Sequence, residues 1–289
     1  FDMKKTFLYI PIALVAVLLF ESCRKIINTN NSGSSHNPIP KIEETEPAVL
    51  TPNYTVINGC IKGFYEAVPA HYHETSELYP VLICLHGGGQ YGDGRNDLPE
   101  VLRDAVPKLV SEKKFPPSFK VNGEPFSFII IAPQFSRVPF AFDLEALLTH
   151  VKKNYRVDTS RIYMTGFSLG GIKTGDFAAE YPYQLAAITA MGGAINQTDD
   201  HAARCKAMAD AKLPVWQFHN IDDSLVSYHE SERFVEDYNN ASPAIPARLT
   251  LFDVGQNDLH HDCWTRTTDP AYRDADGRNI YEWMLQYTR

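Results

Sequence analysis

A serine between two glycines stands where it could act as a nucleophile. Residues 166–170 read Gly-Phe-Ser-Leu-Gly, and they join a strand-like run at 161–165 to a helix-like run at 169–180. The small flanking residues allow a sharp turn, from which the hydroxyl of Ser168 would project alone above a sheet. The same letters also fit an ordinary turn into a helix, so the interpretation as a nucleophile depends on partners elsewhere in the chain.

A hydroxyl nucleophile needs hydrogen-bond donors for the oxyanion that its attack creates. Residues 80–85 are all apolar, as expected for a strand buried on both faces, and His-Gly-Gly-Gly follows at 86–89. Glycines let backbone N–H groups approach a ligand closely. We expect the N–H of Gly88 to be one donor, with Gly89 as the next choice, and the N–H of Leu169 to be the other. The alternative is a flexible glycine turn.

The nucleophile also needs a base and an acid that orients this base. An apolar run at 213–219 is expected to be a strand, and Asp222 and Asp223 lie in the turn after it. Catalytic groups of open α/β sheets gather at this edge of the sheet. Either carboxylate could orient a base, and the other would then serve only the turn.

The base is expected after the last strand. Residues 247–253 alternate as a strand, and His260 and His261 follow them. The order nucleophile, acid, histidine is the one that accompanies a nucleophile elbow of this kind. The alternative use of two adjacent histidines is metal binding, but zinc sites need defined spacings and a carboxylate or thiolate partner. We therefore expect no metal ion and no cofactor.

Strand-like and helix-like runs alternate along the chain. The expected strands lie at 54–67 (a strand or hairpin), 80–85, 126–132, 161–165, 186–190, 213–219 and 247–253. The expected helices lie at 98–112, 142–154, 169–180, 228–238 and 279–286. This order predicts an α/β fold in a single domain, with a mostly parallel central sheet flanked by helices on both faces.

These motifs together resemble those of one family. Over residues 54–287 the chain resembles the α/β-hydrolases of the polyhydroxybutyrate-depolymerase, feruloyl-esterase and dienelactone-hydrolase-like group, which are prolyl-oligopeptidase-family esterases. Members often carry Phe-His-Gly-x-x-Asp-x-x-Val at the acid, and this pattern laid on 218–226 places the acid at Asp223. Asn220 stands where glycine is usual. This departure keeps Asp222 open as an alternative.

The family pattern His-x-x-Trp selects His261 as the base, and the resemblance implies a serine carboxylesterase that works through an acyl-enzyme. The implied substrates are acyl groups on plant polysaccharides, such as feruloyl or acetyl esters. Trp264, and Gln90 directly after the glycines, are candidates for substrate contact, although Trp264 could equally pack the histidine loop. Two alternatives remain open: a small serine peptidase of the prolyl-oligopeptidase type, and a non-catalytic surface lipoprotein that binds glycan.

Composition limits the classes of partner. The chain has 289 residues and a formal net charge of −8, and no basic cluster appears in it. Nucleic-acid binding therefore has no electrostatic basis. We expect a small-molecule or polysaccharide-linked ester as the binding partner.

The first part of the chain is typical of an export signal. Lysines at 4–5 precede an apolar run at 7–20, which is too short for a typical transmembrane helix of about 20 residues. Cys23 follows a small residue after this run, which resembles a loose lipobox in which Cys23 is lipidated, although Glu21 departs from the pattern. The expected divisions are a lipoprotein-type signal peptide at 1–22, a flexible tether at 23–50 and the catalytic domain at 51–289.

Export bears on location and on cysteine chemistry. We expect a lipoprotein of the bacterial cell envelope, in the periplasm or at the outer membrane, which touches the membrane only through its lipid anchor; free secretion is the alternative. An exported protein permits disulfides. Cys84, in an expected central strand, is predicted to be a buried thiol, and a bridge between Cys205 and Cys263 would pin the loop that carries His261.

Overall fold

A mixed sheet forms the centre of the protein. The computed structural model describes residues 43–196, 198, 200–255 and 257–289. In this part of the chain the central sheet has eight strands, in the order β1-β2-β6-β3-β7-β8-β9-β10. These strands are β1 (Val49–Asn53), β2 (Ile61–Val68), β3 (Tyr79–Leu85), β6 (Ile129–Phe135), β7 (Val157–Phe167), β8 (Ala187–Met191), β9 (Val215–Asn220) and β10 (Arg248–Phe252).

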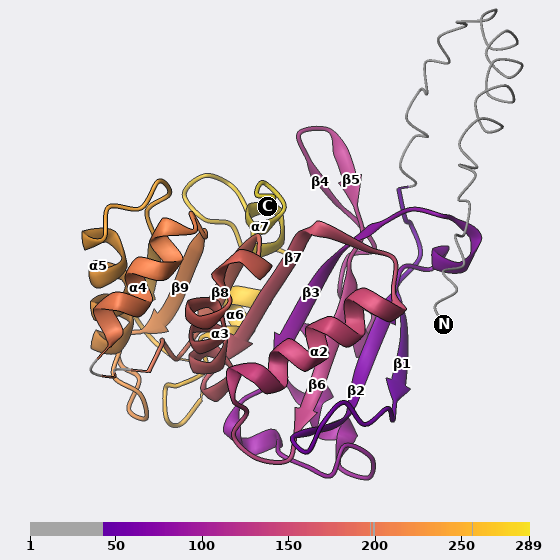
Figure 1. Ribbon diagram of the computed structural model, residues 1–289, viewed down its shortest axis with the longest axis horizontal. Coiled ribbons are helices and arrows are strands. Elements are labelled where there is room, and N and C mark those ends of the chain that lie inside the picture. Colours follow the sequence, from indigo (N-terminus) through magenta and orange to yellow (C-terminus); the bar gives the residue numbers. More distant parts are fainter. Residues whose placement is uncertain (1–42, 197, 199, 256) are drawn as a thin grey trace, which may run out of the picture. The chain divides into compact units, whose positions relative to one another are not determined.

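Most of the sheet is parallel. β3 pairs in parallel with β6 and β7, and β8, β9 and β10 continue in the same sense. β2 pairs antiparallel with β6 and with β1. The predicted α/β fold with a mostly parallel sheet is therefore confirmed. Parallel strands end at one edge of the sheet, so the residues after β3, β7, β9 and β10 lie at the same edge (Figure 1).

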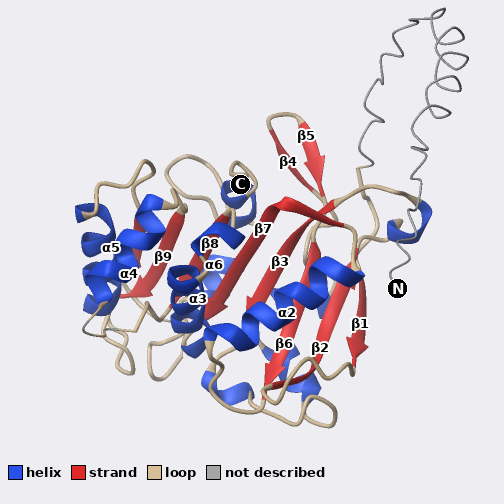
Figure 2. Cartoon of the chain, in the orientation of Figure 1, coloured by secondary structure: helices blue, strands red, loops and turns tan. Residues whose placement is uncertain are grey.

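Helices cover both faces of the sheet (Figures 1 and 2). One apolar core takes side chains from α2 (Ala141–Asn154), α3 (Leu169–Glu180), α4 (His201–Asp210) and α5 (His229–Asn240). The other takes them from α1 (Ala105–Ser111), α6 (Trp264–Thr268) and α7 (Ile280–Met284). Val81 and Ile83 of β3 enter the first core and Leu82 and Cys84 enter the second, because successive side chains of a strand point to opposite faces. The uninterrupted apolar run of β3 is thus explained by burial on both sides.

Some elements differ from those that the sequence predicts. The helix expected at 98–112 is a 3₁₀ helix at Leu98–Arg103 followed by α1, whose first residue, Ala105, has a φ of 53°. Pro107 in the first turn of α1 explains the break, because proline lacks an N–H and its ring clashes with the carbonyl four residues earlier. α4, α6 and the hairpin of β4 (Phe119–Val121) with β5 (Glu124–Phe126) were not predicted.

The start of the domain also differs. β1 begins at Val49 and pairs with β2, and the buried carboxylate of Glu44 accepts a hydrogen bond from the backbone N–H of His71 at 3.2 Å. Glu44 and the first two residues of β1 fall within the tether expected at 23–50. Folded structure therefore begins earlier than residue 51. The signal peptide expected at 1–22 and the lipidation site expected at Cys23 lie outside the described residues. No helix among the described residues is long and apolar enough to cross a membrane.

The cysteines of the described chain are unpaired. Cys60, Cys84, Cys205 and Cys263 are all buried free thiols. The predicted bridge between Cys205 and Cys263 is wrong, because Cys205 lies in the core on one face of the sheet and Cys263 in the core on the other. Burial raises the pKa of both thiols, which keeps them protonated.

Candidate active site

The turn between β7 and α3 holds Ser168 in a conformation that few residues adopt. Its φ is 52° and its ψ is −122°, a strained combination that is found at nucleophile elbows. A Cβ on Gly166 would lie 2.3 Å from the Gly170 carbonyl oxygen, and a Cβ on Gly170 would lie 2.1 Å from the Leu85 carbonyl oxygen. Both glycines of the motif are therefore required, because backbone segments approach one another closely on each side of the serine.

The structure brings the three predicted residues Ser168, His261 and Asp223 into one hydrogen-bonded row. Ser168 Oγ lies 2.9 Å from His261 Nε2, and His261 Nδ1 lies 2.6 Å from Asp223 Oδ2. A carboxylate only accepts hydrogen bonds, so Nδ1 carries the proton and Nε2 presents its lone pair to the serine hydroxyl. The side chain of Asp223 is fully buried and that of His261 nearly so. The row can therefore move a proton from the serine to the imidazole.

His219 and two backbone amides complete the surroundings of Asp223. Oδ1 accepts from the N–H groups of Leu225 and Val226 at 2.9 Å each, and Oδ2 lies 3.1 Å from His219 Nε2. The other ring nitrogen of His219 lies 2.6 Å from Ser231 Oγ. Burial lowers the pKa of His219 and favours the neutral ring, whose Nε2 then carries the proton because the carboxylate can only accept. This second histidine was not predicted from the sequence, although the Phe-His pair that precedes the acidic turn contains it.

Asp222, the alternative acid, faces a different histidine. Its Oδ2 is hydrogen-bonded to His260 Nδ1, and its Oδ1 accepts from the N–H of Gly255 at 2.9 Å. Partial desolvation raises the pKa of Asp222, but these two hydrogen bonds outweigh it and lower the pKa below its usual value. Asn220, the departure from the family pattern, donates from Nδ2 to the His260 carbonyl oxygen at 2.8 Å. Asp222 and Asn220 thus join the acid loop to the base loop.

The histidine pair does not form a metal site. Nδ1 of His260 faces Asp222 and Nδ1 of His261 faces Asp223, so the two rings are bonded to different carboxylates. Among the residues that the structure describes, no group of three His, Cys, Asp or Glu side chains is arranged to hold a metal ion.

His86 fixes the start of the glycine loop. Its Nε2 accepts from the N–H of Phe135 at 2.9 Å, and its Nδ1 lies 2.7 Å from the Gly87 carbonyl oxygen. Burial lowers the pKa of His86 to about 4, so the ring is neutral and its Nδ1–H donates to that carbonyl. A Cβ on Gly87 would lie 2.8 Å from the Phe167 ring and 3.5 Å from Ser168 Cβ. The first glycine is therefore the one that packs against the nucleophile turn.

The predicted oxyanion donors stand at the open end of this loop. A Cβ on Gly88 or Gly89 would meet nothing within 4 Å. Leu169 begins α3, and the first N–H groups of a helix have no acceptor within the helix. Within the described residues, the N–H groups of Gly88, Gly89 and Leu169 make no hydrogen bond. They are free to bind an anion, as an oxyanion hole requires.

A pocket of about 220 Å³ opens beside the serine. Its lining includes the glycine loop, Ser168 and His261, together with Gln90, Arg103, Asp104, Phe167, Leu225 and Trp264. The Trp264 ring lies 4.6 Å from the Phe167 ring at 30° and meets the His261 ring edge-on at 5.2 Å. Trp264 therefore does both things that the sequence left open, because it lines the pocket and packs against the predicted base.

Gln90 lines the pocket, but its amide is already used. Oε1 accepts from the N–H of Gly87 at 3.2 Å. Nε2 donates to the Glu100 carbonyl oxygen at 2.9 Å and to Asp104 Oδ2 at 3.1 Å. Its amide holds the glycine loop against the segment at 98–104, and contact of Gln90 with substrate stays a prediction.

Comparison with known proteins shows the family. The phospholipase/carboxylesterase family model matches residues 72–248, and the chain belongs to this family of α/β-hydrolase fold. The matched part contains Ser168 and Asp223 and ends before His261. The description of this family names phospholipases and carboxylesterases, which supports an enzyme that hydrolyses carboxylic esters.

Individual relatives are more distant. The chain is 27% identical over 94 residues to the bifunctional acetylxylan esterase/xylanase XynS20E of Neocallimastix patriciarum, a match that covers 32% of this chain and 13% of that protein. A thermostable esterase superposes with a TM-score of 0.55 at 20% identity over 84% of this chain and 63% of its own. A ferulic acid esterase superposes with a TM-score of 0.52 at 16% identity over 78% and 97%. At these identities the superpositions show the fold alone.

Proposed function

We propose that this protein is a serine carboxylesterase with Ser168 as nucleophile, His261 as base and Asp223 as the acid that orients the base. The observation that carries the proposal is the continuous row of two hydrogen bonds, at 2.9 and 2.6 Å, from the serine oxygen through the imidazole to the carboxylate. The free N–H groups beside the serine support the same proposal, since acyl transfer needs donors for an oxyanion.

The reaction proceeds in two halves. Ser168 Oγ attacks the ester carbonyl while His261 Nε2 takes the hydroxyl proton, and the N–H groups of Leu169 and Gly88 hold the oxyanion. The imidazolium, stabilised by Asp223, then gives its proton to the departing alcohol oxygen, and the acyl-enzyme remains. In the second half a water gives its proton to His261 and attacks the acyl carbon. The imidazolium returns this proton to Ser168 Oγ as the acid leaves, which restores the serine hydroxyl.

Acyl groups on plant polysaccharides are the proposed substrates, with acetyl and feruloyl esters as the two classes. The names of an acetylxylan esterase relative and of a ferulic acid esterase of the same fold support this choice. The pocket also suits a sugar ester, because it combines the aromatic rings of Trp264 and Phe167 with the polar side chains of Asp104 and Arg103.

The test is Ser168→Ala, with Ser111→Ala, an exposed serine at the end of α1, as the matched control. We expect Ser168→Ala to abolish turnover of p-nitrophenyl acetate and labelling by a fluorophosphonate probe, while its circular dichroism is unchanged. Retained turnover would rule out the assignment, and absent labelling of the wild-type protein would favour the non-catalytic alternative. A panel of acetylated xylan, methyl ferulate and peptide p-nitroanilides separates the ester substrates from a peptidase activity.

Export and lipid anchoring are a separate proposal that rests on the sequence alone. The apolar run at 7–20 and the Ser-Cys pair that ends at Cys23 support a lipoprotein signal, with lipid attached to Cys23. Metabolic labelling with a clickable palmitate analogue should mark the expressed wild-type protein, whereas Cys23→Ser should abolish the label. Equal labelling of the variant would contradict this site.

A further inference from the structure

Phe167 lines two separate cavities on the same face of the sheet. One is the pocket of about 220 Å³ at Ser168. The other is a narrow space of about 10 Å³ further from the carboxyl edge, among Cys84, Thr165 and Val106. Phe167 is the residue common to the linings of both, so its ring stands between them.

The ring of Phe167 is held firmly in this place. Tyr163 and Phe167 belong to the same core, because every second side chain of β7 points to that face. The ring packs directly on the Cα of Gly87, where a Cβ would be only 2.8 Å away, and it stacks on Trp264 at 4.6 Å. Only 6% of Phe167 is exposed. The ring therefore closes the pocket rather than swinging into it.

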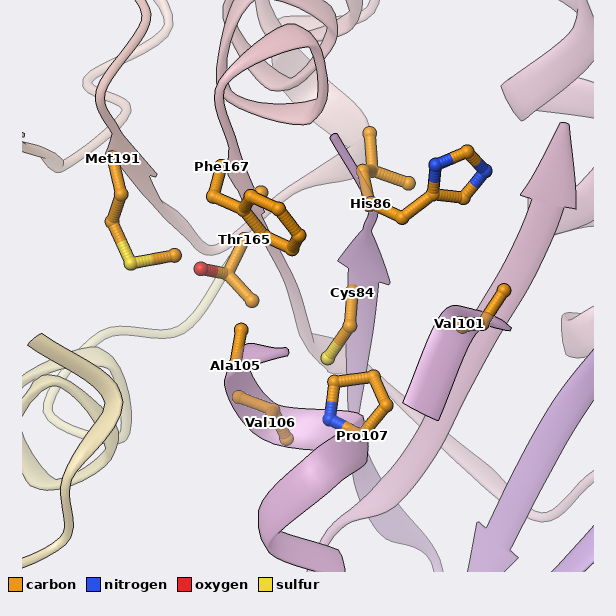
Figure 3. A pocket seen from close by; sticks show the side chains of 11 residues that line it. Cys84, His86, Val101, Ala105, Val106, Pro107, Thr165, Phe167 and Met191 are labelled. Atoms are coloured by element: carbon orange, nitrogen blue, oxygen red, sulfur yellow. The ribbon is translucent and has the colours of Figure 1, made fainter. Parts of the chain in front are cut away.

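The narrow space behind the ring is apolar. Its lining side chains include Cys84, Ala105, Val106, Pro107 and Met191, which Figure 3 shows around the Phe167 ring. A space of this size has room for about one water, and a water would need two or more polar partners to stay. Methylene groups suit these walls better than polar groups do.

We propose that Phe167 ends the acyl side of the pocket, so that the enzyme prefers acetyl-sized groups over long or aromatic acyl groups. The proposal rests on the proposed function, in which Ser168 carries the acyl group. It decides between the two substrate classes named above, and favours acetyl over feruloyl esters.

The acyl group is assigned to this closed side because the alcohol needs an open one. A polysaccharide alcohol cannot enter an enclosed core, and it leaves with the chain attached. The pocket is open along the acid and base loops, where Leu225 is 60% exposed beside the serine and Ile221 and Leu259 are also exposed. The small product of the first half-reaction, the acyl group on Ser168, is then the part that faces Phe167.

The test enlarges the pocket and measures chain-length preference. Wild type, Phe167→Ala and Phe167→Leu are assayed for kcat/KM on p-nitrophenyl acetate, butyrate and octanoate. Phe167→Ala should raise the octanoate-to-acetate ratio about ten-fold or more, since pockets of this kind discriminate at about that level per methylene. Phe167→Leu should raise it less, and it gives the answer if the alanine variant does not fold. Phe128→Ala and Phe128→Leu, at a buried phenylalanine near the start of β6, are the matched controls and should leave the ratio unchanged.

Refilling the cavity gives a second readout. In the Phe167→Ala background, Cys84→Leu adds bulk to the narrow space and should lower the octanoate-to-acetate ratio again. A series of ethyl, butyl and octyl acetates, which varies the alcohol, should show no change of preference in any of these variants.

Two results would overturn the inference. One is an unchanged acyl ratio in variants whose Ser168 still reacts with the fluorophosphonate probe; the other is a shift in alcohol preference in place of acyl preference. Neither would affect the proposed function, which is tested separately by the turnover of Ser168→Ala and by fluorophosphonate labelling of the wild-type protein. The two ideas can therefore be contradicted separately.

Discussion

The nucleophile side of the site and the acid–base side are held together in different ways. Around Ser168 the chain packs so closely that a methyl group on Gly166 or Gly170 would collide with a backbone carbonyl, and one on Gly87 with the Phe167 ring. Between the loops after β9 and β10 the contacts are hydrogen bonds from side chains, such as Asn220 to the His260 carbonyl oxygen. The nucleophile side depends on close packing at positions without a side chain, and the acid–base side depends on hydrogen bonds between polar groups. We therefore expect the first half to reject added bulk and the second to respond to loss of a donor or acceptor.

The largest effect is expected within the acid loop itself. Asp223→Asn should lower kcat by roughly 10⁴-fold, because the amide no longer selects the imidazole tautomer that the serine needs. Asp222→Asn is the matched change one residue away, and it should cost less than about ten-fold, since Asp222 only joins two loops. Measuring kcat for both variants on p-nitrophenyl acetate compares the two carboxylates directly. The reverse order of losses would make Asp222 the acid.

The glycine loop should show the next largest effect. Gly87→Ala adds a methyl group 2.8 Å from the Phe167 ring, so the loop must shift and carry the Gly88 N–H away from the oxyanion. Losing one such donor typically lowers kcat by about 10²–10³-fold. Gly59→Ala, where the added Cβ would meet nothing within 4 Å, is the control and should keep wild-type kcat. Full activity of Gly87→Ala would show that the chain around Ser168 tolerates added bulk, which would contradict the difference between the two sides of the site.

A smaller effect is expected from the second histidine on the acid. His219→Ala removes a buried donor that positions Asp223 Oδ2. The carboxylate then holds the imidazole less precisely toward Ser168, so kcat should fall about ten-fold or more with little change in KM. The carboxylate charge is then less shared and stabilises the imidazolium of His261 more strongly. The acidic limb of the kcat/KM profile should accordingly move to higher pH. His219→Gln can still donate to the carboxylate and accept from Ser231. It should restore part of the lost kcat and reverse part of the shift in the pH profile.

The buried ring of His219 should also make the stability of the wild-type protein depend on pH. The pKa of His219 is lowered by burial in the folded protein, so the unfolded chain binds a proton there more readily. This contribution to stability is complete above the usual histidine value of about 6.5 and is lost as the pH falls below it. Chemical unfolding at pH 7.5 and 5.5 should show a smaller pH effect in His219→Gln than in wild type. An equal pH effect in the two proteins would contradict the buried neutral ring.

Much of the fold could be predicted because its signals are local. The uninterrupted apolar run of β3 and the strand–turn–helix around Ser168 are visible within a few residues, and α3 begins and ends where the sequence predicts. β1 could not be predicted in this way, since it is a short edge strand with mostly exposed side chains. The break before α1 follows from Pro107, a local signal that was available and was not used.

The site was predictable where residue type alone carries the chemistry. Residue order limited the acid to two adjacent aspartates and the base to two adjacent histidines. The family patterns then selected Asp223 and His261, which the structure brings within hydrogen-bonding distance of each other and of Ser168. His219 was missed because its partner Ser231 lies on α5, a separate element whose packing brings the two side chains together. No sequence pattern in this chain predicts such a contact.

The contact between the Phe167 ring and Gly87 has a consequence for anyone who wishes to engineer the enzyme. In the proposed enzyme the ring that ends the acyl side of the pocket also packs against the loop of Gly87, which carries the proposed oxyanion donors. Replacing Phe167 by a smaller residue to admit larger acyl groups therefore removes a packing contact of the glycine loop. We therefore expect a variant at this position that accepts a wider range of acyl groups to have a lower kcat.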